Sequence, residues 1–94
     1  GILYSIFGKF HAAKRNWDLA KHSFSNAITI LQELGLEFNL AWAYVYIAQM
    51  HIDKGEPGIG ITYLEKARAI FEKLNNTYLA ERFRKKAQEI AKSE

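Results

Sequence analysis

The stretch AWAYVYIAQMHIDKGEP, residues 41–57, joins a run of aliphatic and aromatic side chains to an abrupt polar stop at Gly-Glu-Pro. The apolar run extends only from Leu40 to Ile52 and includes Gln49 and His51. A helix that crosses a bilayer needs about 20 predominantly apolar residues. The length of the run therefore argues against a membrane segment, and the stretch is either a ligand pocket or one copy of a packing unit.

The stretch matches the N-terminal segment when the chain is aligned with itself so that Tyr4 falls on Tyr44. We call this alignment the repeat shift, and it continues through the second half of each unit. The other matched pairs are Phe7 with Ile47, Gly8 with Ala48, His11 with His51, Lys14 with Lys54, Ala20 with Gly60, Phe24 with Leu64, Ala27 with Ala67, Ile30 with Ile70, Leu31 with Phe71 and Leu34 with Leu74. Self-similarity at a fixed period of this size is typical of stacked-repeat proteins. The sequence therefore predicts one repeat over residues 1–40 and a second over residues 41–80.

Apolar residues within each unit recur at steps of three and four, which predicts amphipathic helices with an apolar stripe along one side. In the second hairpin the stripe residues are Leu40, Ala43, Tyr44, Ile47, Ala48 and His51 on the first helix, and Ile61, Leu64, Ala67, Ile70, Phe71 and Leu74 on the second. Five helices are expected: from about Leu3 to Lys14, from Trp17 to Leu34, a third that carries Leu40 to His51, from Pro57 to about Leu74, and from Thr77 to about Lys92. Gly35 suits a left-handed helix end, and Pro57 suits a first helical turn. The expected fold class is all-α, with two helix hairpins followed by one further helix.

Small residues at matched positions predict close helix crossings. Gly8 pairs with Ala20 in the first hairpin, and Ala48 pairs with Gly60 in the second. A larger side chain at such a crossing would overpack it.

These residues resemble the tetratricopeptide repeat family. The first copy of the pattern reads Tyr4, Phe7, Gly8, His11, Ala20, Phe24 and Ala27, and the second reads Tyr44, Ile47, Ala48, His51, Gly60, Leu64 and Ala67. The unit is longer than the family's usual length of about 34 residues, and His replaces the commoner Tyr at His11 and His51. The resemblance implies an α-α superhelix, with residues 77–94 as a capping helix or the start of a third unit, and a chain that is a fragment of a larger protein.

The resemblance also implies that the first helix of each unit lines a concave groove that binds a polypeptide. Carried over by position, the groove residues are Ile2, Ser5, Lys9, Trp42, Val45, Tyr46, Gln49, Arg82, Lys85, Lys86 and Glu89, together with Ala12, Ala13 and Asp53. Trp42 and Val45 lie off the hairpin stripe, so they either anchor a ligand peptide or cover a neighbouring repeat that is missing from this fragment. Some family members grip C-terminal carboxylates through a five-residue basic and amide clamp, of which only Arg82 and Lys86 match here.

Composition bounds the other functions. The chain has no Cys, so disulfides and thiolate metal sites are excluded and a reducing cytoplasm is expected. No nucleophile with an orienting base and no phosphate-binding loop is present, so we expect a protein that is not an enzyme and takes no cofactor or metal. His11 and His51 are interpreted as packing residues, since neither has a ligand four residues on, and His22 as solvated. The net charge of +3 is mild, which disfavours nucleic-acid binding through the basic tail.

The predicted function is therefore a non-catalytic interaction module that binds a protein or peptide, with acidic peptides favoured by Lys9, Arg82 and Lys86. The alternative is a structural role, in which the repeat joins flanking repeats or forms a homo-oligomer through its open ends.

Overall fold

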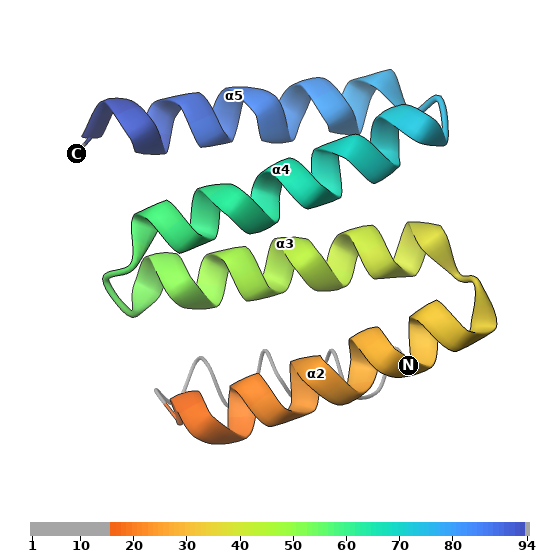
Figure 1. The fold of residues 1–94 in the computed structure, drawn as a ribbon. Helices are drawn as coiled ribbons and strands as arrows, with labels where there is room; N and C mark the ends of the chain where they lie inside the picture. The colour runs from red at the N-terminus through yellow and green to blue at the C-terminus, as the bar shows by residue number, and fades with distance from the viewer. Residues whose placement is uncertain (1–15, 94) are drawn as a thin grey trace.

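The computed structural model describes residues 16–93. Four α-helices follow one another in this part of the chain: α2 (Trp17–Leu34), α3 (Glu37–Asp53), α4 (Pro57–Lys73) and α5 (Thr77–Ser93). They run antiparallel and side by side in chain order (Figure 1). Each helix packs on the next one along the chain, and α3 packs most extensively on α4. The described residues are all-helical apart from their turns.

The helices begin at evenly spaced positions, 17, 37, 57 and 77. Each of the three turns contains one residue with positive φ: Gly35 at 67°, Gly55 at 89° and Asn75 at 61°. Gly tolerates this conformation without steric cost, and Asn adopts it more readily than most residues. Residues 17–76 are therefore three successive helix-and-turn units of the same length.

Equivalent backbone hydrogen bonds close all three turns. The amide N–H of the residue that follows each positive-φ residue reaches back to a carbonyl of the last helical turn: Leu36 to Leu31 at 3.0 Å, Glu56 to His51 at 2.7 Å and Asn76 to Phe71 at 2.8 Å. This bond belongs to the Schellman motif, which satisfies carbonyls that a helix end leaves unpaired. The regular spacing thus comes from one turn geometry used three times.

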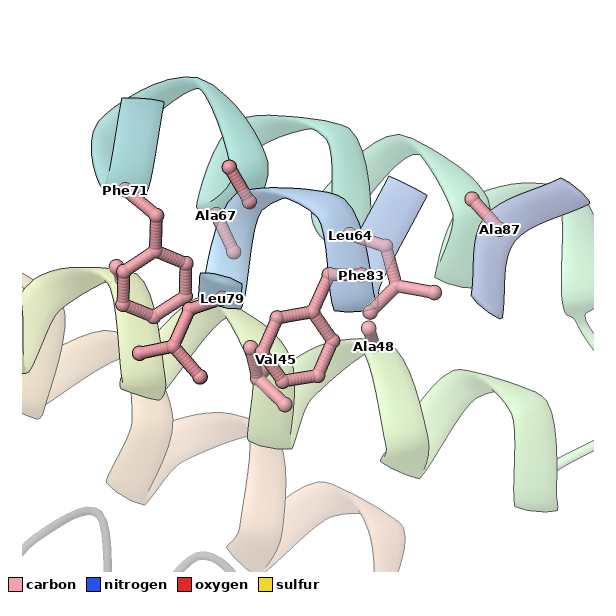
Figure 2. Packing of buried hydrophobic residues seen from close by; sticks show 10 residues of the cluster. Val45, Ala48, Leu64, Ala67, Phe71, Leu79, Phe83 and Ala87 are labelled. Atoms are coloured by element: carbon pink, nitrogen blue, oxygen red, sulfur yellow. The ribbon is translucent and has the colours of Figure 1, made fainter. Parts of the chain in front are cut away.

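The principal core lies between α3, α4 and α5 (Figure 2). Phe71 is fully buried in this core, and its ring lies edge-on to those of Phe38 and Trp42, with centroids 5.9 and 5.7 Å away. The remaining buried members are Ala41, Val45, Ala48, Leu64, Ala67, Leu79, Ala80, Phe83 and Ala87. Two smaller clusters join α2 to α3, one around Phe24 and Met50 and one around Leu31 and Leu40.

Helix α3 is buried on more sides than its predicted stripe. The stripe residues Leu40, Ala43, Ile47 and Ala48 are buried as predicted, but so are Ala41, Val45 and Met50. The reason is that α2 covers one side of α3, α4 covers another, and side chains of α5 reach a third. A central helix with three neighbours needs apolar residues almost all round. This explains the run of apolar residues in the stretch 41–57.

The close crossing predicted for Ala48 and Gly60 is confirmed. A Cβ atom at Gly60 would lie 2.7 Å from Ile52 Cγ1 and 3.0 Å from the carbonyl oxygen of Ala48. These distances are shorter than ordinary van der Waals contacts, so α3 and α4 approach each other at a place where only glycine fits without adjustment. The matching prediction for Gly8 lies outside the described residues.

The predicted helix ends agree closely with the structure. The predicted α2 has the observed bounds, and the predicted α4 and α5 differ from the observed helices by one residue at the C-terminus. The first of the five predicted helices, Leu3 to Lys14, lies outside the described residues. One stripe residue was wrongly predicted: Leu74 is 38% exposed, as its match Leu34 is at 65%, because both lie where the helix enters a turn.

Residues matched by the repeat shift have similar environments in α2 and α4. Four of the matched pairs are buried, and every member of them other than glycine is at most 1% exposed: Ala20 and Gly60, Phe24 and Leu64, Ala27 and Ala67, and Leu31 and Phe71. The shift also relates the positive-φ residues Gly35 and Asn75. The two units thus share burial and turn geometry over the positions that can be compared.

Candidate interaction surface

A set of polar side chains links α3 to α5 at the surface. Lys86 on α5 donates a hydrogen bond from Nζ to Gln49 Oε1 on α3 at 3.1 Å. Gln49 in turn donates from Nε2 to Asp53 Oδ1 at 2.9 Å. All three belong to the residues predicted to line the groove, and the structure brings them together. We call the region formed by Trp42, Tyr46, Gln49, Asp53 and Lys86 the α3–α5 surface.

Trp42 and Val45 pack on α4 and α5, which neither of the two roles left open by the sequence described. Val45 is 8% exposed and belongs to the core. The Trp42 ring is half-buried and meets the rings of Phe71 and Phe83 edge-on, with centroids 5.7 and 5.6 Å away. These contacts cover α5 and the end of α4. The partner-facing role expected of Val45 is therefore incompatible with its burial, whereas Trp42 retains some exposed surface.

Tyr46 lies beside Trp42 one helical turn later, and the two rings are 6.2 Å apart at a tilt of 36°. Tyr46 is half-buried and Gln49 is exposed. Exposure therefore increases along this side of α3, from the packed indole of Trp42 to the solvated amide of Gln49. Such amphipathic aromatic residues are enriched in protein interfaces.

The predicted α5 residues divide between two places. Lys86 joins the α3–α5 surface through Gln49, whereas Arg82 and Lys85 line a hollow along α4 and α5. Glu89 is exposed. The remaining predicted groove residues, Ile2, Ser5, Lys9, Ala12 and Ala13, lie outside the described residues.

The hollow along α4 and α5 includes residues that the sequence interpretation did not single out. Its volume is about 820 Å³, and it is lined by Arg68, Glu72, Thr77, Tyr78, Ala80, Glu81, Arg82, Arg84 and Lys85. Tyr78 is the most exposed large apolar residue in the described part of the chain, at 74%. The repeat shift pairs Tyr78 with Phe38, which is 48% exposed, and this match was the available signal.

Ion pairs organise the walls of this hollow. Arg68 donates from Nε to Glu65 and from Nη1 to Glu72, at 2.9 and 2.6 Å. Glu65 and then Glu72 hold the pKa of the Arg68 guanidinium above its usual value. Arg84 makes a two-pronged contact with Glu81, which raises the pKa of Arg84 and lowers that of Glu81. These exposed pairs fix the side chains of the walls more than they stabilise the fold.

His51 packs against an aromatic ring and meets an acid. Its ring is parallel to that of Tyr63 at 5.6 Å, and its Nδ1 lies 2.9 Å from Glu56 Oε1. A carboxylate accepts, so the pair places a hydrogen on Nδ1. The hydrogen bond from His51 lowers the pKa of Glu56, and the Lys54 charge acts in the same direction. Tyr63 also stacks on Tyr44, and Lys66 lies over both rings.

This arrangement makes His51 part of the packing between α3 and α4, as the sequence interpretation held. His51 and Glu56 occupy the two turn positions where an apolar contact commonly accompanies the Schellman motif, and here the contact is a hydrogen bond. His22 is exposed, in agreement with its interpretation as solvated. His11 lies outside the described residues.

Residues 16–93 contain no group of three or more His, Cys, Asp or Glu side chains placed to hold a metal ion. No helix in this part of the chain has the length and hydropathy needed to span a bilayer.

Comparisons with known proteins give no relative. No protein-family model matches the chain, and no curated protein or solved structure matches it either.

Proposed function

We propose that this chain is a non-catalytic interaction module of the tetratricopeptide-repeat kind, with its helix hairpins stacked into a superhelix. Its function would be to hold a peptide or an extended segment of a partner protein against the α3–α5 surface. The support for the repeat comes from the matched burial in α2 and α4 and from the equivalent turns at regular spacing.

One observation carries the choice of surface. Side chains of α3 and α5 meet although the two helices do not pack backbone against backbone: Lys86 bonds Gln49, and the rings of Trp42 and Phe83 touch. First helices of successive units that meet in this way present one continuous strip of aromatic and polar groups. A peptide could bury apolar surface at Tyr46 and the open edge of Trp42, and direct hydrogen bonds to Gln49 and Lys86.

The direct test is selection of binders from a displayed library of random peptides, followed by affinity measurement for one selected peptide. The variant Gln49→Ala/Lys86→Ala removes the polar bridge without touching the core. A matched variant, Lys21→Ala/Thr29→Ala, removes two exposed polar side chains from α2. We expect the first variant to weaken binding about tenfold or more and the second to leave it within about twofold.

Trp42→Ala is a poor test of the same surface, because Trp42 packs on Phe71 and Phe83 and its loss would also destabilise the fold. Equal weakening by the two double variants, or a library that yields no binder, would count against the proposed surface.

The second candidate is assembly through exposed apolar residues. Leu34, Leu36, Phe38 and Leu74 are all at least 38% exposed and come from the α2–α3 and α4–α5 turns, which lie at the same end of the helices (Figure 1). Exposed apolar groups that gather at one place commonly mark an interface. Sedimentation at several concentrations separates the two candidates: a dimer that grows with concentration and is lost in Leu34→Ser/Phe38→Ser supports assembly, and a concentration-independent monomer excludes it.

A further inference from the structure

The hollow along α4 and α5 lies one repeat after the place that α4 itself occupies. Helix α4 packs against α3, and its Tyr63 and Ile70 pack against the two clusters that join α2 to α3, as Ile28 and Tyr44 do. The Tyr63 ring also stacks on that of Tyr44. The repeat shift matches Ile28 with Arg68 and Tyr44 with Arg84, and both arginines line the hollow. The hollow is therefore the position at which the next helix of the repeat pattern would pack.

The residues that line this hollow are charged where their matches in the preceding repeat are apolar. Besides the two arginines, Glu81 is matched with Ala41. Farther along α5, the residues matched to Ala48 and Ile52 at the close crossing with Gly60 are Gln88 and Lys92. An apolar helix like α4 would have to desolvate the Arg68–Glu72 and Arg84–Glu81 pairs without replacing their water, which is unfavourable. The position keeps the shape of a helix site but disfavours another helix of the same kind.

The balance of charge in the hollow indicates what would fit instead. Its lining contains four cations, Arg68, Arg82, Arg84 and Lys85, and two anions, Glu72 and Glu81. The two anions are already bonded to Arg68 and Arg84. Within the described part of the chain, neither Arg82 nor Lys85 forms an ion pair; the Arg82 guanidinium lies 5.4 Å from the centre of the Phe83 ring. Two of the cations described for the hollow thus have no bonded acid, and the exposed residue Tyr78 lines the same hollow.

From this shape and charge we infer that the α4–α5 hollow is a docking site for an acidic amphipathic helix of a partner protein. The carboxylates of such a helix would meet Arg82 and Lys85, and its apolar face would cover Tyr78. A second copy of this chain fits less well, because it carries a net charge of +3 and would be repelled at low ionic strength. The site is separate from the α3–α5 surface and does not depend on the function proposed for it.

The test uses the whole chain labelled with ¹⁵N and three probes. The first probe is a synthetic helical peptide of Glu, Leu and Ala with the length of α4, which has 17 residues. The second is the same peptide with Lys in place of every Glu, and the third is a short DNA duplex. We expect the acidic peptide to shift the amide signals of Thr77, Tyr78, Ala80, Arg82 and Lys85, and its affinity to fall as salt is added.

Charge reversal in the hollow provides the matched comparison. Arg82→Glu/Lys85→Glu should weaken the acidic peptide about tenfold or more, whereas Lys21→Glu/Lys73→Glu, which changes the net charge equally but elsewhere on α2 and α4, should weaken it less than about threefold. All four side chains belong to exposed residues, and the far-UV circular dichroism of each variant checks that it folds.

Other outcomes overturn the inference. Shifts centred on Gln49 and Lys86 would place the acidic peptide on the α3–α5 surface, which would support the proposed function while refuting this site. Equal weakening by the two charge-reversed variants would show that only net charge matters. Binding of the lysine peptide, tighter binding of the DNA duplex at the same residues, or no shift with the acidic peptide would also refute it.

Discussion

The crossing of α3 and α4 at Gly60 gives a prediction whose sign can be worked out from distances. In Gly60→Ala, the new methyl group would lie 2.7 Å from Ile52 Cγ1, 3.0 Å from the Ala48 carbonyl oxygen and 3.3 Å from Ile52 Cδ1. Ile52 is β-branched and therefore stiff at its first side-chain torsion. The Ala48 oxygen belongs to the helix backbone. Neither neighbour can move away without displacing one helix relative to the other.

Two opposing effects set the magnitude. Alanine in place of glycine inside a helix stabilises by about 0.8–1 kcal/mol. Overpacking a close contact costs typically about 1–3 kcal/mol. The clash should win, so we expect a net loss of about 1 kcal/mol in the free energy of unfolding. In a domain of this size, such a loss lowers Tm by about 4–8 °C.

Urea unfolding followed by circular dichroism measures the change, and Gly58→Ala is the matched control. Gly58 lies in the same helix, has nothing within 4 Å of the position that its new methyl group would take, and does not have a positive φ. Its replacement should stabilise by about 0.4–1 kcal/mol. The two substitutions are chemically identical, so opposite signs isolate the crossing.

A double-mutant cycle locates the clash further. Ile52→Ala removes both side-chain atoms that the new methyl group meets, so Gly60→Ala should cost less in the Ile52→Ala background than in the wild type. If Gly60→Ala instead raised the stability as much as Gly58→Ala does, the crossing could not be tight, and our account of α3–α4 packing would be refuted.

Three further predictions use the same unfolding measurements. Phe71→Ala should lose about 3–5 kcal/mol because the ring is fully buried, while Tyr78→Ala, 74% exposed, should change stability by no more than about 0.5 kcal/mol; similar losses would contradict the assigned core. Asn75→Val should lose about 1–2 kcal/mol because φ is 61°, and Asn75→Gly should not; a stable valine variant would argue against the left-handed turn. Because the hydrogen bond from His51 lowers the folded-state pKa of Glu56, the wild type should be more stable than Glu56→Gln above the ordinary carboxyl pKa, and this advantage should vanish as the pH falls through the lowered value; an advantage that persists in acid would exclude the pair as its cause.

Much of the fold could be read locally from the sequence. The ends of α2, α4 and α5 were predicted to within one residue because Gly35, Pro57 and Asn75 act on the backbone of their own segment. The crossing at Gly60 followed from its match with Ala20, since small residues recur where two helices of each unit meet. Burial of Phe24, Leu31, Leu64 and Phe71 followed from the helical period.

The candidate site could be predicted only in part. Its α3 and α5 residues were found by repeat position, and Gln49 and Lys86 do meet. The helical period of α5 could not show that Arg82 and Lys85 line a hollow together with residues of α4. Neighbouring residues of α5 lie beside different helices: Lys86 bonds to α3, whereas Arg82 and Lys85 lie beside α4. The ion pairs of Arg68 and Arg84 depend on side-chain geometry that no spacing rule specifies.

The sequence by itself determined the helical period, the lengths of the helices and the turn positions, since each depends on residues within a few places of one another. Only the tertiary structure decided what the off-stripe residues of α3 do. Trp42 and Val45 are packed rather than fully displayed because Phe83, which lies two helices farther along the chain, is carried over them by the turn at Asn75. Burial of that kind depends on which helix lies next in space, and the sequence pattern of a single helix does not specify its neighbour.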